Sequence, residues 1–130
     1  MISQPAQTPI MNGAALTARI IKDQLIDIDQ ASSGLLGLDN SLQVISIETF
    51  DCNQIPFAIG SAISDAVMAS ATGIVIYSIA PEGTSSAFDS DEIERFTRLC
   101  ESMNVVLLDV ISFSSSVAQG WTSARQRGEI

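Results

Sequence analysis

The sequence predicts an α/β fold in which a central β-sheet is flanked by helices. Apolar, β-branched segments of strand length alternate along the chain with longer segments whose apolar residues recur at helical spacing. The chain has 130 residues, which is close to the commonest size of one domain and is enough to bury a core. Its residues are 46% hydrophobic and 16% charged, which is typical of globular proteins rather than disordered ones.

The N-terminal part is predicted to form a flexible arm followed by an amphipathic helix. Residues 1–11 contain prolines and several polar residues, and a single domain is expected over residues 12–130. A helix is predicted over residues 12–29, because apolar side chains recur there on one helical face. These side chains are Leu16, Ile20, Ile21, Leu25 and Ile28. Such a helix must bury this face against its own domain or against a partner.

A β-hairpin and a second helix are predicted next. The apolar run Leu35–Leu38 and the alternating, β-branched run Gln43–Phe50 are separated by a turn signal that begins at Asp39. Asp39 is expected to cap this turn rather than to act in catalysis. The Ala- and Ser-rich run Ile59–Ala71 has helical spacing, and its small residues favour close packing on a sheet. We expect Gly73 to stop this helix.

The C-terminal half is predicted to contain two buried strands, Ile74–Ile79 and Val105–Phe113, connected through a loop and a helix. Asp89 precedes Glu92 by three residues, which is the spacing of a capping box. The connecting helix is therefore expected to begin at Asp89 or Ser90.

Two residues near the C-terminus need an explanation. Asp109 lies inside an apolar strand, where an unpaired carboxylate would be costly. We expect it to be hydrogen-bonded or to pair with Arg125 or Arg98. The last segment, Val117–Ile130, carries Trp121, which suits the core and an interface equally well.

The charge balance disfavours nucleic acids and membranes as partners. Lys and Arg number 6 and Asp and Glu number 15, so the formal net charge is -9. The basic residues are scattered, and no basic stripe that could neutralise phosphates can be drawn. No apolar run approaches the roughly 20 residues that a membrane-spanning helix needs. The two cysteines are far apart and no secretory signal is recognisable, so a cytoplasmic location is expected.

The absence of histidine limits the chemistry that is open to this chain. Ser-His and Cys-His catalytic pairs are excluded, and so are His-ligated zinc and haem. General acid-base catalysis by imidazole is excluded as well.

Several stretches, in order, resemble the RadC branch of the JAB/MPN (JAMM) metalloprotease superfamily. The resemblance covers roughly residues 30–130, and its pieces are Leu36-Gly37-Leu38-Asp39, Ile59–Ser78, Pro81 with Gly83, Leu107-Leu108-Asp109 and Ser123-Ala124-Arg125-Gln126-Arg127-Gly128. The resemblance implies a JAB/MPN-like (cytidine-deaminase-like) sandwich with a central mixed sheet. It also implies a zinc ion held by two His in an H-x-H motif and by an Asp on the next helix, with a Glu as general base.

The chain departs from this family at the metal centre. The two His positions fall on Ser78 and Ala80, and the Asp position falls on Ile93 or on Asp91, depending on how the loop is aligned. The Glu position falls near Ala31, and Asp29 is close to it. Zinc needs about three protein ligands to activate a water molecule, and Ser and Ala do not replace two imidazoles. These positions are therefore interpreted as vestigial, no cofactor is expected, and the peptidase activity is not expected to carry over.

The leading hypothesis is a catalytically inactive domain that acts as a protein-interaction or oligomerisation scaffold. Its partner would be a second copy or another protein, and the interface candidates are Leu16, Ile20, Leu25 and Trp121. One alternative is a hydrolase with a rebuilt acidic site around a cation, for which Glu82, Asp89 and Asp91 would supply oxygen ligands. Another is a small-molecule or peptide binder. It would use the groove vacated beside Pro81, Glu82, Gly83 and Asp89.

Overall fold

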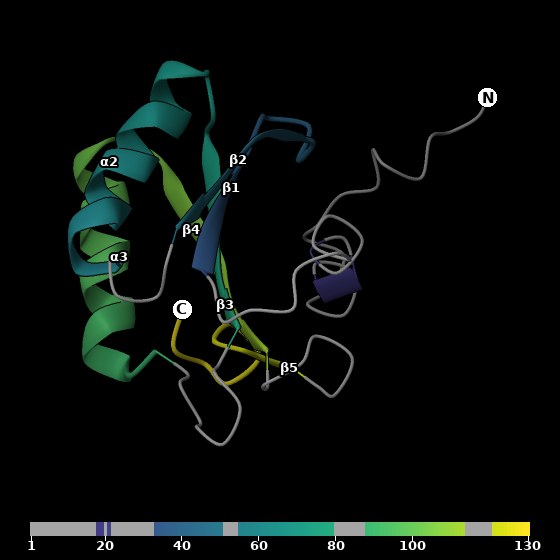
Figure 1. Ribbon diagram of the computed structural model, residues 1–130, viewed down its shortest axis with the longest axis vertical. Coiled ribbons are helices and arrows are strands. Elements are labelled where there is room, and N and C mark those ends of the chain that lie inside the picture. Colours follow the sequence, from purple (N-terminus) through teal and green to yellow (C-terminus); the bar gives the residue numbers. More distant parts are fainter. Residues whose placement is uncertain (1–17, 20, 22–32, 51–54, 80–87, 114–120) are drawn as a thin grey trace.

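The computed structural model describes residues 18–19, 21, 33–50, 55–79, 88–113 and 121–130. These residues form an α/β fold (Figure 1). Its elements are, in chain order, β1 (Ser33–Leu38), β2 (Val44–Phe50), α2 (Ile55–Met68), β3 (Gly73–Ile79), α3 (Ser90–Ser102), β4 (Val106–Phe113) and β5 (Trp121–Ser123).

The strands form one mixed sheet in the order β2-β1-β3-β4-β5. β3 and β4 are parallel, and the other neighbouring pairs are antiparallel. The predicted hairpin of β1 and β2 is confirmed. The Asp39 carboxylate accepts hydrogen bonds from the backbone N–H groups of Ser41 (2.8 Å) and Gln43 (3.0 Å), so it caps the turn as expected.

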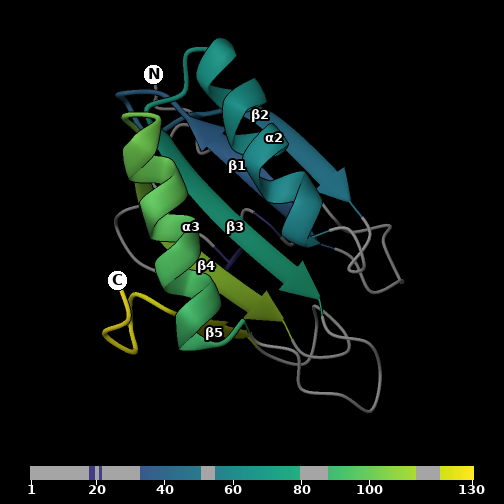
Figure 2. The same cartoon turned by 90° about the vertical axis from the view of Figure 1, so that its left-hand side faces the viewer.

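Both long helices pack on one face of the sheet. Figure 2 shows α2 in front of β1 and β2, and α3 in front of β4. Their apolar faces meet alternate side chains of the strands, and the largest fully buried ones include Ile59, Ile63, Phe96, Ile74 and Ile76. This arrangement explains the small residues of α2: Ala62 and Ala66 are buried in the same cluster.

The opposite face of the sheet carries a second apolar cluster. Tyr77 of β3 and Phe113 of β4 are fully buried there. Ala18 and Ile21 belong to this cluster, and Figure 1 shows these N-terminal residues on the side of the sheet away from α2 and α3. Ile21 lies on the predicted apolar face of the N-terminal helix, and it is buried against its own sheet. Most other residues of that helix lie outside the described ones.

The bounds of α2 differ from the prediction. The helix begins at Ile55, with Pro56 in its first turn, and it ends at Met68. The prediction began this helix at Ile59. Proline is tolerated in a first helical turn because the N–H groups there have no helical partner, so Pro56 does not prevent the helix from beginning earlier. Beyond the helix, Ser70 has a φ of 76° and the Ala71 N–H donates to the Ala66 carbonyl. This backbone turn ends the helix, whereas Gly73 already belongs to β3.

A candidate site where β3 and β4 end

A row of hydroxyl groups crosses the sheet near the carboxyl ends of the parallel strands. The strand register places Ser78 of β3 beside Ser33 of β1 and beside Ser112 of β4, and Thr122 of β5 continues the row. Ser33, Ser78 and Ser112 are buried, with exposed fractions of 0%, 3% and 7%. Ser78 lies two residues after Ile76, so it shares the sheet face that α2 and α3 cover. Ligand sites of α/β proteins commonly lie at this end of the sheet.

The first turn of α3 lies at this end of the sheet and is closed by the predicted capping box. The Asp89 carboxylate accepts from the Glu92 N–H at 2.8 Å, and the Glu92 carboxylate accepts from the Asp89 N–H at 3.1 Å. Asp89, one of the acidic side chains considered for a cation site, is thus hydrogen-bonded to the helix itself, and so is Glu92. Asp91 is exposed, whereas Ile93 is buried in the core.

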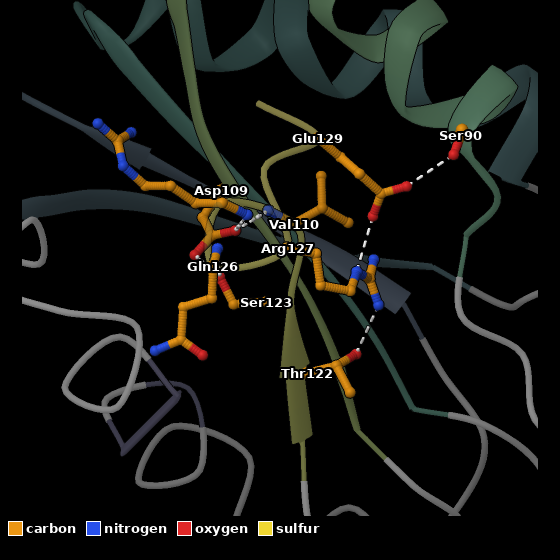
Figure 3. Close-up of polar contacts among 9 residues, drawn as sticks. Ser90, Asp109, Val110, Thr122, Ser123, Gln126, Arg127 and Glu129 are labelled. Carbon is orange, nitrogen blue, oxygen red and sulfur yellow. Dashed lines mark hydrogen bonds and ion pairs between the residues drawn. The ribbon is translucent and has the colours of Figure 1, made fainter.

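The C-terminal residues are tied to the start of α3. The Ser90 hydroxyl donates to one carboxylate oxygen of Glu129 at 2.7 Å, and Arg127 Nε donates to the other at 2.7 Å (Figure 3). Arg127 also donates to the Thr122 hydroxyl at 3.2 Å. The hydrogen bond from Ser90, together with the Arg127 guanidinium, lowers the pKa of Glu129. This chain of contacts connects α3 with β5.

Asp109 organises the turn that follows β5. Its side chain is buried and accepts from the Ser123 hydroxyl at 2.6 Å, from the Val110 N–H at 2.7 Å and from the Arg125 N–H at 3.0 Å. Figure 3 shows this carboxylate beside Ser123. The structural role expected for Asp109 is confirmed. Of the two arginines considered, Arg125 contacts it through the backbone, and its guanidinium donates instead to the Leu108 carbonyl.

The alternative expectation, that Asp109 pairs with Arg98, was wrong. Arg98 forms an ion pair with Glu94 of the same helix at 2.6 Å, and both side chains are largely exposed. The i,i+4 spacing explains this pairing, since such residues are neighbours on a helix surface.

The structure places only part of the predicted site. Ala80, Pro81, Glu82 and Gly83 lie outside the described residues, and so do Leu16, Ile20 and Leu25. Ser78, Asp89, Asp91 and Ile93 lie near the end of β3 and in the start of α3. Trp121 is partly buried, lies opposite Phe113 and packs against the second apolar cluster, so at least part of its surface serves the core.

Two polar features were not foreseen from the sequence. The Tyr77 hydroxyl is buried, and it forms no hydrogen bond with any residue in the part of the chain that the structure describes. Burial raises the pKa of Tyr77 to about 12. Its ring lies directly over Gly34, the residue opposite it on β1, and a Cβ at Gly34 would overlap the ring. Only the strand register reveals this pair.

The second feature is a pair of carboxyl groups on the edge of the domain. Glu48 of β2 and Asp65 of α2 share a hydrogen bond. Burial raises the pKa of Glu48, and the hydrogen bond and negative charge of Asp65 raise it further. No sequence signal links the two residues, because they belong to different elements.

This pair predicts how stability depends on pH. A raised pKa means that the folded protein favours the protonated form of Glu48. The stability that this form provides is complete below pH 4.5, the ordinary pKa of a glutamate, and it is lost as the pH rises through the raised pKa. We expect Glu48→Gln to raise the free energy of unfolding at pH 7 by less than about 1 kcal/mol, because solvent screens the pair. Urea unfolding at pH 4 and pH 7 measures this gain, which should vanish at pH 4. Glu101→Gln, at an exposed carboxylate of α3, is the control. A loss of stability on Glu48→Gln at pH 7 would show that the Glu48 and Asp65 carboxylates do not repel each other.

Within the described residues, no group of three or more His, Cys, Asp and Glu side chains lies together so that it could hold a metal ion. In the same part of the chain, no helix has the length and apolar character needed to cross a membrane. The sequence matches no protein-family model and no curated protein.

Proposed function

We propose that this protein is a non-catalytic protein-interaction module with a JAB/MPN-like architecture. The order of hairpin, helix, strand, helix and strand around a mixed sheet is compatible with that architecture. Those of the quoted motif stretches that lie within the described residues follow the same order, on β1, on α2 and β3, on β4, and from the end of β5 into the turn after it. The proposed partner is another protein or a second copy, in the cytosol.

The main observation in support of this proposal is that polar groups at the start of α3 form hydrogen bonds within the protein itself. Asp89 and Glu92 bond to the backbone of the helix, and Ser90 bonds to Glu129. A carboxylate that caps a helix stabilises the fold by about 1 kcal/mol, so these contacts account for both acidic side chains without a metal ion or a substrate. Asp89, Ser90 and Glu92 therefore have roles within the fold.

The zinc ion that the resemblance implies does not fit the residues present. Ser78, at the position of the first His, is buried among hydroxyl groups of neighbouring strands. Ile93, one alternative for the third ligand, is buried in the core, which leaves Asp91 as the other. Serine hydroxyls and one exposed carboxylate do not form the nitrogen- and sulfur-rich set that zinc prefers.

A rebuilt site for Mg or Ca is also poorly supported. These cations take about six or more oxygen ligands, several of them carboxylates. Asp89, one of the acidic residues considered for such a site, already accepts a hydrogen bond from the helix, and so does the adjacent acidic residue Glu92.

Metal titration tests the non-catalytic part of the proposal. We expect isothermal titration calorimetry with Zn²⁺ and with Mn²⁺ to show no binding at micromolar concentrations. Thermal unfolding should be unchanged by either ion, because an ion that binds only the folded state would raise the melting temperature.

The variants Asp91→Ala and Glu101→Ala separate a real site from surface binding. Both remove an exposed carboxylate from α3, but only Asp91 lies in its first turn. One ion bound per chain, and lost with Asp91→Ala but not with Glu101→Ala, would overturn the proposal and restore the hydrolase hypothesis.

A further inference from the structure

The outer edge of β2 is open within the described part of the chain. β2 is the terminal strand of the sheet and pairs only with β1 among these residues, so its other edge presents backbone N–H and C=O groups (Figure 2). The strand contains neither proline nor lysine, the residues that commonly protect such edges. A seven-residue strand is long enough to pair with another strand.

The two sides of this edge differ in chemistry. Ile47 lies opposite Leu36, whose side chain belongs to the second apolar cluster, and it is 42% exposed. The neighbouring Ile45 is 38% exposed. Glu48 lies opposite Leu35 on the face that the helices cover, where it meets Asp65 of α2. An apolar surface thus borders one side of the edge, and a pair of acidic groups borders the other.

We infer that β2 binds an extended, basic segment of a partner protein as an additional strand. In such a strand, alternate side chains point to opposite faces. A Lys or Arg of the segment would reach Glu48 and Asp65, and the adjacent residue would be apolar and pack on Ile47. This inference rests on the proposed function as an interaction module, and it names the chemistry of the partner.

Charge favours a basic partner over a second copy of this chain. Antiparallel pairing of two β2 strands about Ile47 would place Glu48 opposite Ser46 of the second copy, with the second Glu48 on the adjacent diagonal. The four carboxyl groups of two Glu48 and Asp65 pairs would then gather on one face, between chains that each have a formal charge of -9. A cationic side chain would instead relieve the repulsion within each pair.

The N-terminal arm of the same chain is a poorer occupant. Residues 1–11 contain no Lys or Arg, so they offer no cation to the acidic pair. Their prolines lack the N–H group that strand pairing requires.

A designed peptide tests the inference on the whole protein. The probe is a capped peptide of alternating lysine and valine, about seven residues long to match β2. We expect it to shift the amide NMR signals of β2 at peptide concentrations up to about 1 mM. A glutamate–valine peptide has the same apolar residues with the opposite charge and should not bind. The lysine–valine peptide with N-methyl groups on alternate amides retains the charge but loses strand pairing, and it should not bind either.

Variants of the protein locate the contacts. Glu48→Gln with Asp65→Asn removes the repulsive pair without harm to folding, and it should weaken peptide binding about fivefold to tenfold. Ile47→Thr keeps a β-branched residue in the strand but reduces the apolar contact, so it should weaken binding as well. Glu101→Gln, on an exposed carboxylate of α3, should leave binding unchanged.

Three outcomes would overturn the inference. They are an absence of shifts in β2, equal binding of the N-methylated peptide, and equal binding by the Glu48→Gln/Asp65→Asn variant. Concentration-dependent dimers in light scattering that Ile47→Thr dissociates would assign the edge to a second copy instead. None of these results bears on metal binding near α3, so failure of this inference and failure of the non-catalytic proposal are distinguishable.

Discussion

Replacement of Asp109 by alanine is expected to lower the free energy of unfolding by about 3 kcal/mol. The buried carboxylate accepts three hydrogen bonds, and its removal leaves the Ser123 hydroxyl and the Arg125 N–H without their partner. A buried donor that loses its acceptor costs about 1–3 kcal/mol. The damage should be concentrated in β5 and the turn after it, since both of these donors lie there.

The single tryptophan makes this effect measurable. Trp121 is the first residue of β5 and the only tryptophan of the chain, so its fluorescence reports on this strand. In urea, Asp109→Ala should shift the fluorescence transition to lower denaturant than the far-UV circular dichroism transition, which is dominated by α2 and α3. Ser123→Ala is the graded control. It removes one of the three hydrogen bonds to Asp109, together with the bond that the Ser123 hydroxyl accepts from the Gln126 N–H, and it should cost about 1–2 kcal/mol. If the fluorescence and circular dichroism transitions of Asp109→Ala coincided, at the urea concentration of the wild-type transition, the carboxylate would not be what holds β5 in place.

The elements that could be predicted from the sequence are those with local signals. The capping box of α3 depends on two side chains three residues apart, and both of its hydrogen bonds form. The hairpin turn depends on Asp39, which bonds within its own loop. The start of α2 was misplaced because Pro56 is compatible with a loop and with a first helical turn, and the local sequence does not distinguish them.

The features that could not be predicted depend on strand register. Ser33, Ser78 and Ser112 are far apart in the sequence and become neighbours only when β1, β3 and β4 align. A shift of one residue would turn every side chain of a strand to the opposite face. The contact between Glu48 and Asp65 has the same origin, since it requires α2 to lie over β2. Pattern and composition do not specify register, so these clusters appear only in the structure.

Gly34→Ala is expected to lower the free energy of unfolding by about 1–3 kcal/mol, because the new methyl group would overlap the Tyr77 ring. Tyr77 is fully buried, so its ring could move aside only by displacing the residues packed around it. Gly60→Ala is the matched control. Gly60 lies in α2, and the methyl group of an alanine there would meet no other atom within 4 Å, so this variant should preserve stability or raise it by up to about 1 kcal/mol.

Tyr77→Phe changes the other residue of this contact, and it should raise the free energy of unfolding. It removes a buried hydroxyl that lacks a hydrogen-bond partner among the described residues, so we expect the protein to gain about 1 kcal/mol at pH 7.

The ionisation of Tyr77 adds a pH dependence to this comparison. The pKa of Tyr77 is raised from 10.0 to about 12, so the folded protein favours the neutral phenol. The stability that the neutral phenol provides is complete below pH 10 and is lost as the pH rises through about 12. Urea unfolding between pH 8 and pH 11 should therefore show a smaller alkaline loss for Tyr77→Phe than for the wild type. Cys100, whose pKa burial also raises to about 12, contributes the same alkaline loss to both proteins. A destabilised Tyr77→Phe variant would mean that the hydroxyl has a partner in the folded protein, and equal alkaline slopes would mean that Tyr77 ionises without cost.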